Sequence, residues 1–206
     1  MRYDAVSTMN FEHHKYHQNA QQLKTEEQII AAAKINPEQF EQLYNKYFLA
    51  IYKYVLVRIE NKHQTDEIVS KVFSKALFKL KQFKFRGVPF SSWLYRIAYN
   101  EINDMFRKRK AERVVQVPLE YFSEYQSLED DQDDLYEKEK SIDRMLETIK
   151  QLQKIEIELL ELRFFEKRSY REIGDILEIT EDNAKVKTHR VIKKLQKLFG
   201  AKIKQL

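Results

Sequence analysis

The sequence predicts an all-α protein of two small helical domains that are joined by a flexible acidic linker, the second domain ending in a helix-turn-helix. Three observations lead to this fold class. Only 3 Gly and 3 Pro occur in 206 residues, whereas the helix-favouring residues Lys, Glu, Leu, Ile and Gln abound. Apolar residues recur at a helical period up to residue 112 and again after residue 142. Between these segments the apolar pattern is lost and the chain becomes acidic.

The charge distribution supports the same division. Residues 1–112 carry 19 Lys or Arg and 12 Asp or Glu, residues 113–141 carry 3 and 9, and residues 142–206 carry 15 and 11. Two basic segments with net charges of +7 and +4 therefore flank an acidic segment of −6. Basic domains favour polyanions through counterion release, and DNA would repel an acidic tract unless a positively charged partner held it.

The first domain is expected at residues 27–112, after an N-terminal extension of residues 1–26. The extension is polar, rich in His and Gln and without sustained periodicity, so we expect it to be mobile. Asn36 and Pro37 then serve as the cap and first residue of a helix. The apolar stripe of this helix comprises Phe40, Leu43, Tyr44, Tyr47, Phe48, Ile51 and Val55.

Two further helices complete the first domain. One starts near Thr65, and its buried side comprises Ile68, Val72, Phe73, Ala76, Leu77 and Leu80. Gly87 and Pro89 break the pattern before the next helix, which runs from about Ser91 to Lys110. Its apolar side comprises Trp93, Leu94, Ile97, Ala98, Ile102 and Met105. Three such helices can enclose one aromatic-rich core.

The acidic linker, residues 113–141, contains Pro118 and an acidic run at 129–134 without a clear buried face. The second domain, residues 142–206, begins with a helical stripe of Ile142, Met145, Leu146, Ile149 and Leu152, followed by Ile155, Leu159 and Leu160. It ends in the helix-turn-helix.

Residues 169–198 read as two short amphipathic helices joined by a tight turn. Ser169 is placed to cap the first helix, with Glu172 in the capping-box position, and Thr180 caps the second. In the second helix the buried spacing is Ala184, Thr188, Val191, Leu195 and Leu198. Eight Lys or Arg and no acidic residue follow Asp182. Such a helix fits the DNA major groove, although a two-helix hairpin with a basic outer face would show the same pattern.

Composition argues against several other classes. The chain has no Cys, which excludes disulfides and thiolate zinc sites. No apolar run approaches a membrane span and no secretory segment is evident, so we expect a cytoplasmic protein. The acidic run 129–134, or His13, His14 and His17, could be read as metal ligands, but no orienting groups surround them. We therefore expect neither an enzyme nor a metal or cofactor.

Two blocks of sequence resemble bacterial RNA polymerase sigma factors of the sigma-70 family, of the small extracytoplasmic-function (ECF, group IV) type. At about residues 39–110 the matching segments are FEQLYNKYFLAIYKYVLVRI, TDEIVSKVFSKALFKL and FKFRGVPFSSWLYRIAYNEINDMFRKRK, of which FRG followed by WLYRIAYN is the most specific. The second block is LLELRFFEKRSYREIGDILEITEDNAKVKTHRVIKKL. The chain departs from the family pattern at Ser70-Lys71, at Asp182-Asn183 and at Glu178, where a Gly is common.

The resemblance implies that the chain binds core RNA polymerase, recognises promoter DNA as duplex and as melted non-template strand, and is held by an anti-sigma factor. Opening DNA requires a basic track with aromatic groups for unpaired bases. The expected minus-ten residues are Phe85, Arg86, Phe90, Tyr95, Arg96, Asn100, Arg107, Lys108, Arg109 and Lys110. Trp93 is expected in the core rather than on DNA.

The same resemblance assigns two other surfaces. The minus-thirty-five element would be read by Thr180, Asn183, Lys185, Val186, Lys187, His189 and Arg190. Core polymerase would contact Asp66, Glu67, Ser70 and Phe73, although the two acids could equally serve the helix dipole and Phe73 could be buried.

Two other functions remain open from the sequence: a stand-alone helix-turn-helix regulator, and a module that sequesters another factor. The length of the linker bears on the first alternative, a stand-alone regulator. A linker of 29 residues spans about 30 Å relaxed and up to about 95 Å extended, whereas two turns of DNA occupy about 70 Å. Engaging both promoter elements requires a stretched linker, so we expect weak promoter binding by the free protein.

Overall fold

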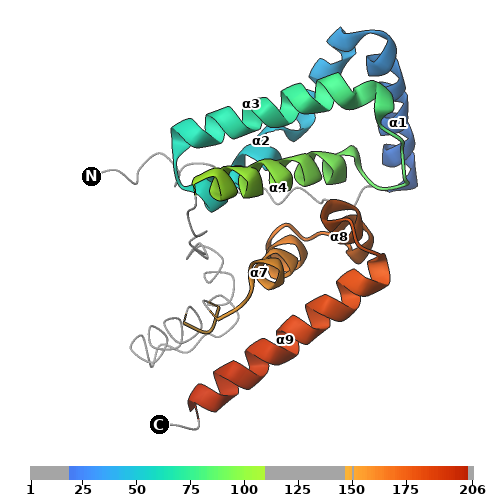
Figure 1. The fold of residues 1–206 in the computed structure, drawn as a ribbon. Helices are drawn as coiled ribbons and strands as arrows, with labels where there is room; N and C mark the ends of the chain where they lie inside the picture. Colours follow the sequence, from blue (N-terminus) through green and yellow to red (C-terminus); the bar gives the residue numbers. More distant parts are fainter. Residues whose placement is uncertain (1–18, 110–146, 150, 204–206) are drawn as a thin grey trace, which may run out of the picture.

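The computed structural model describes residues 19–109, 147–149 and 151–203. Within these ranges every regular element is a helix, which confirms the all-α fold class (Figure 1). The first domain contains α1 (Ala20–Ile35), η1 (Pro37–Gln39), α2 (Phe40–Ile59), α3 (Lys62–Lys79), η2 (Leu80–Gln82) and α4 (Phe90–Arg109). The second contains α7 (Lys154–Leu160), the π-helical turn η3 (Glu161–Phe165), α8 (Tyr170–Leu177) and α9 (Glu181–Ile203). The described residues include no helix that is both long and apolar enough to cross a membrane.

The core of the first domain lies among α2, α3 and α4, with α1 across one end of the bundle (Figure 1). The predicted stripes meet there, and their fully buried members are Leu43, Ile51, Val55, Val72, Ala76, Leu94 and Ala98. Leu77 was expected on the buried side of its helix, but that prediction is wrong, because the residue is 40% exposed. The predicted start at Asn36-Pro37 is confirmed as a short 3-10 turn, in which Asn36 Oδ1 accepts a hydrogen bond from the backbone of Glu38. Helix α3 begins at Lys62, slightly before the expected Thr65, because Asn61 caps it.

Helix α1 corrects the expected boundary of the N-terminal extension. Asn19 and Gln22 form a reciprocal capping box, so the helix begins within the stretch that we expected to be mobile. Ile30 and Ala33 are buried, and so is the charged Glu26. The first domain therefore includes residues from Ala20 onward. Residues 1–18, and the whole of the predicted linker 113–141, lie outside the described residues.

The helix-turn-helix has the predicted local structure. Ser169 Oγ accepts from Glu172 N at 3.2 Å, and Glu172 Oε2 accepts from Ser169 N at 3.0 Å. Glu178 ends α8 in the left-handed conformation with φ of 57°, where the family pattern has Gly. Gly174 has to lack a side chain, because a Cβ atom there would lie 2.8 Å from the carbonyl oxygen of Ile179. Thr180 Oγ1 accepts from Asn183 N at 3.2 Å, which begins α9.

The predicted inner face of α9 is also confirmed. Ala184, Thr188 and Val191 are buried against the rest of the second domain. Helix α8, which carries the capping box, packs in turn against α4 of the first domain (Figure 1). The two domains therefore share an interface.

Candidate nucleic-acid interface

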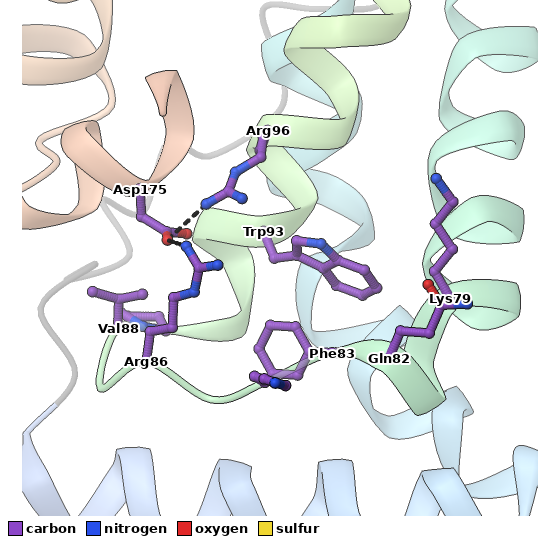
Figure 2. Close-up of a pocket in the computed structure, with 10 residues that line it drawn as sticks. Lys79, Gln82, Phe83, Arg86, Val88, Trp93, Arg96 and Asp175 are labelled. Carbon is purple, nitrogen blue, oxygen red and sulfur yellow. Dashed lines mark hydrogen bonds and ion pairs between the residues drawn. The ribbon is translucent and has the colours of Figure 1, made fainter. Parts of the chain in front are cut away.

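A cavity of about 220 Å³ lies between the end of α3, the loop of residues 84–89 and the start of α4 (Figure 2). The rings of Phe83 and Trp93 lie 4.9 Å apart on its wall. Its full lining is Lys79, Gln82, Phe83, Lys84, Arg86, Val88, Pro89, Trp93, Arg96 and Asp175. Aromatic faces beside several cations form the combination that stacks an unpaired base and neutralises its phosphates.

Trp93 has two roles in this cavity. It packs on Phe90 with ring centroids 5.4 Å apart, as expected for a core residue. It is only partly buried, however, and its remaining surface faces the cavity. Phe83 was not among the predicted site residues. Its position just before the FRG segment was the signal that could have identified it.

Two cations of the cavity are held by carboxylates of the second domain. Figure 2 shows Arg86 and Arg96 both directed at Asp175 of α8, with Nη to Oδ1 distances of 3.3 and 2.6 Å. Arg96 also lies 3.4 Å from Glu178. In addition, Arg171 Nη2 donates to the backbone carbonyl of Arg86 at 2.9 Å. In this arrangement both arginines are paired with carboxylates of the second domain.

Phe90 and Tyr95 were predicted to meet DNA, but both side chains are fully buried. For Phe90 the prediction is wrong, because the ring lies in the core, 6.4 Å from Phe40 and 5.2 Å from Phe83. Tyr95 lies between the domains. Its ring is 4.7 Å from that of Tyr54, and its hydroxyl donates to the carboxylate of Glu166 at 2.6 Å.

The remaining minus-ten candidates are distributed along α4 and the loop before it. Arg86, Asn100, Arg107 and Lys108 are exposed, and Phe85 is half-buried. The side chain of Arg109 and the whole of Lys110 fall outside what the structure describes. The exposed candidates extend the basic track from the cavity toward the end of α4.

The predicted minus-thirty-five residues lie on α9, except Thr180, which caps that helix. Lys187 is half-buried, and the exposed members are Thr180, Asn183, Lys185, Val186, His189 and Arg190. Val186 is 46% exposed, an apolar side chain placed among cations. His189 lies beside the ring of Tyr170, at 6.2 Å between centroids. Among the residues that the structure describes, no cluster of His, Cys, Asp and Glu could hold a metal ion.

An aromatic groove of about 320 Å³ lies between α2 and α3. Its lining is Tyr44, Phe48, Tyr52, Asp66, Val69, Ser70, Phe73 and Ser74. Of the predicted polymerase residues, Asp66, Glu67 and Ser70 are exposed, whereas Phe73 is buried beneath Tyr44 with ring centroids 4.7 Å apart. Burial and the neighbouring carboxylate of Asp66 raise the pKa of the Tyr52 phenol.

Buried charges lie at the interface between the domains, and sequence reasoning missed them. Arg58 Nη2 lies 2.7 Å from Glu161 and 3.3 Å from Glu158, and the hydroxyl of Tyr54 also donates to Glu158. Burial alone would lower the pKa of Arg58, but Glu158 and Glu161 outweigh it and raise the pKa. In the sequence, the feature that could have indicated these buried charges is a charged residue within an apolar run. Arg58 follows Val55 on its helix, and Glu158 is flanked by apolar neighbours.

A second buried arginine lies nearby. Arg168 Nη1 donates to Ser91 Oγ at 3.0 Å and to Glu172 Oε1 at 3.1 Å. Its guanidinium carbon lies 4.2 Å from the ring centroid of Tyr95. Arg168 therefore connects the start of α4 to the capping box of the helix-turn-helix.

Comparison with known proteins agrees with this architecture. Residues 43–112 match the family model of Sigma-70 region 2, and residues 148–197 match that of Sigma-70, region 4. The ECF RNA polymerase sigma factor BldN of Streptomyces coelicolor is 24% identical over 162 residues, which cover 79% of this chain and 61% of BldN. The ECF RNA polymerase sigma factor SigX of Bacillus subtilis is 27% identical over 164 residues, which cover 78% of this chain and 83% of SigX.

Two solved structures share the fold. CnrH, in complex with the cytosolic domain of CnrY, superposes with a TM-score of 0.57 at 20% identity, covering 85% of this chain and 97% of CnrH. The sigma factor RpoE of Bartonella quintana, in complex with the anti-sigma factor NepR, gives a TM-score of 0.53 at 18% identity, covering 79% of this chain and 98% of RpoE. With both sigma-70 regions matched in order over more than half of its residues, this chain belongs to the sigma-70 family and is an RNA polymerase sigma factor of the ECF type.

Proposed function

We propose that this sigma factor binds core RNA polymerase, recognises the minus-thirty-five and minus-ten elements of its promoters and promotes strand opening. The observation that carries the proposal is the presence of two different basic surfaces in one chain. The first domain has an aromatic, basic cavity, and the second has an exposed basic helix. A stand-alone helix-turn-helix regulator would use only the second surface, so that alternative is not favoured.

The cavity of the first domain is the proposed site for a base of the melted minus-ten strand. Phe83 and Trp93 would stack on the base, and each such stack contributes about 1 to 3 kcal/mol. Arg86 and Lys84 lie at the same cavity and would meet the adjacent phosphates. The exposed cations further along α4 would continue the phosphate track.

The exposed face of α9 is the proposed reader of the minus-thirty-five element. Lys185 and Arg190 can pair with guanine edges, Asn183 with adenine, and Val186 with a thymine methyl. Each good contact to a base discriminates by about 1 to 3 kcal/mol. The same cations contribute salt-dependent affinity wherever they meet phosphates instead.

The aromatic groove between α2 and α3 is the proposed surface for core polymerase. Asp66 and Ser70 line this groove, and Tyr44 leaves 38% of its surface accessible there. The exposed acid Glu67 follows Asp66 on α3. Large aromatic side chains at a partly open groove contribute most to protein interfaces when a partner covers them. Phe73 would support the groove from beneath rather than contact the partner.

Strand capture requires the two domains to separate. In the closed arrangement α8 engages Arg86 and Arg96, and the second domain covers Tyr95. The span of two DNA turns gives a second, independent reason, because a relaxed linker of 29 residues is too short for it. We therefore infer that core polymerase holds the domains apart, and that the free protein binds promoters weakly.

Further partners and limits follow from this proposal. RpoE of Bartonella quintana was solved with the anti-sigma factor NepR, and we infer a partner of the same class for this chain. The chain itself would catalyse no reaction, since synthesis of RNA belongs to the polymerase. Its place of action would be the cytoplasm, where polymerase meets DNA.

Run-off transcription with purified core enzyme over a library of genomic fragments tests the proposal. The expected result is a small set of transcripts that depend on the added sigma factor and share two sequence elements. Charge reversal by Lys185→Glu together with Arg190→Glu should abolish those transcripts, while pull-down of core polymerase stays intact. If the chain retains no core subunits, or starts occur at the same places without it, the proposal fails.

A further inference from the structure

Glu26 of α1 is a buried carboxylate with partners on two other helices. Its Oε2 accepts a hydrogen bond from the backbone N–H of Phe90 at 2.6 Å. Its Oε1 accepts from Lys46 Nζ at 2.7 Å and from the hydroxyl of Tyr47. The side chain of Glu26 has no exposed surface. Such burial of a charge is tolerated only where several donors compensate it, so these partners fix its position.

Phe90 is the first residue of α4, and the preceding residue is Pro89. Proline offers no side-chain oxygen to cap a helix, so the N–H groups at this end need acceptors from elsewhere. A carboxylate at a helix N-terminus is also favoured by the helix dipole. Glu26 therefore caps α4 from a position 64 residues earlier in the chain.

Lys34, on the same helix α1, holds the other end of the loop. Its Nζ donates to the backbone carbonyl of Phe83 at 2.7 Å, and the ammonium lies 6.0 Å from the centroid of the Phe83 ring. Phe83 is the C-terminal cap of η2, directly before the loop 84–89. One helix thus binds the backbone at both ends of the segment that carries Arg86 and Gly87.

The spacing on α1 limits the span of this loop. Eight residues of helix separate Glu26 from Lys34, which is about 12 Å along the axis. Six loop residues could extend over about 20 Å, so a loop held at both ends is bowed rather than stretched. Gly87, with φ of 70°, provides the left-handed turn within the bow. The cavity wall formed by Phe83 and Trp93 adjoins both tied ends.

We propose that α1 positions the base-capturing loop, with Glu26 and Lys34 acting as positioning residues through the backbone of Phe90 and Phe83. This inference rests on the proposed function of the cavity. The matched family model begins at residue 43, so α1 lies outside it. Melted-strand capture should therefore depend on two side chains that are not part of the cavity lining.

The test uses the holoenzyme, assembled from core polymerase and the full chain, on a promoter recovered in the transcription experiment. Glu26→Gln keeps the shape of the side chain, but its amide has one acceptor oxygen where the carboxylate has two. Lys34→Met keeps the length of the side chain and removes its donor. Controls are Glu27→Gln and Lys24→Met, which make the same changes at exposed positions of α1.

Two measurements separate positioning from general structure. One is binding of the holoenzyme to a labelled single strand that carries the non-template minus-ten sequence. The other is hydrogen exchange of the peptide that spans residues 84–92. We expect about tenfold weaker strand binding for Glu26→Gln and about threefold for Lys34→Met, with faster exchange of that peptide alone. Core polymerase binding and duplex minus-thirty-five binding should match those of the controls.

The inference is overturned if both variants bind the melted strand as the controls do, or if strand binding falls only in proportion to polymerase binding. Should Glu26→Gln fail to fold, Lys34→Met decides the question by the same measurements. A wild-type chain that supports no transcription with core polymerase would overturn the proposed function, and this inference with it. Normal transcription by every variant overturns the inference alone.

Discussion

Neutralising Asp175 should open the free protein. Its carboxylate is the acceptor that Arg86 and Arg96 share across the interface between the domains, and its side chain is 12% exposed. Asp175→Asn keeps the shape of the side chain while removing the negative charge. The two arginines are then less strongly held, and the cavity becomes accessible to nucleic acid.

The contacts set the size of the effect. The Arg96 contact is short and mostly buried, and a hydrogen bond between charged groups of this kind contributes about 1.5 to 3 kcal/mol. Arg86 is 65% exposed, so its contact at 3.3 Å contributes under about 1 kcal/mol. An asparagine side chain would retain part of both contacts, because its amide oxygen still accepts hydrogen bonds. A net loss of about 1 to 2 kcal/mol corresponds to a shift of about fivefold to thirtyfold toward the open form.

The assay measures opening and binding together. The chain has no Cys, so dyes can be attached to cysteines introduced at the exposed positions Glu41 of α2 and Lys197 of α9. We expect lower energy transfer for Asp175→Asn, and fivefold to thirtyfold tighter binding of a fluorescent single-stranded DNA. Asp182→Asn makes the same charge change at an exposed site and controls for net charge. Unchanged transfer, or equal gains in both variants, would refute the reasoning.

Three further outcomes follow from the described contacts. Arg58→Met leaves Glu158 buried without its cation and should lower the free energy of unfolding by about 3 to 5 kcal/mol in urea titrations, whereas adding Glu158→Gln should restore much of it. Burial acts to raise the pKa of Glu156, but the hydrogen bond from Lys194 at 2.6 Å and a backbone hydrogen bond outweigh it and lower the pKa below 4.5. This contact therefore stabilises the fold above pH 4.5 and is lost as the pH falls through the lowered value, so Glu156→Gln should reduce the acid-induced loss of stability by under about 1 kcal/mol. Lys185→Met should reduce the slope of log affinity against log salt by about 1 on promoter duplex if Lys185 meets a phosphate, and should instead relax base preference if it meets a guanine.

Local patterns predicted the helix-turn-helix well because its geometry depends on nearby residues. Ser169 and Glu172 cap each other three residues apart, and Thr180 caps the next helix in the same way. Glu178 shows that even the unusual left-handed turn could be expected from its place in the pattern. These features involve hydrogen bonds within one helical turn, which sequence spacing fixes directly.

The surroundings of the predicted minus-ten residues were harder to predict because α4 is covered on more than one side. Phe90 and Leu94 face the core of their own domain, whereas Tyr95 and Arg96 meet α7–α8 elements of the other. A periodic pattern identifies apolar positions, but it does not reveal which polar or aromatic residues a second domain will cover. The expectation of a basic aromatic site near the FRG segment therefore included two aromatic side chains, Phe90 and Tyr95, that packing buries.

By itself, the sequence determined the helices, their caps, the division into two basic domains and the membership of a family, because propensity, spacing and composition are properties of adjacent residues. Only the tertiary structure decided that Glu26 caps a helix 64 residues away, that Arg58 lies against two glutamates, and that Asp175 forms ion pairs with the two arginines of the cavity. Each of these contacts joins groups far apart in the chain. Their energies depend on burial and on distances of a few ångströms, which exist only once the helices have packed.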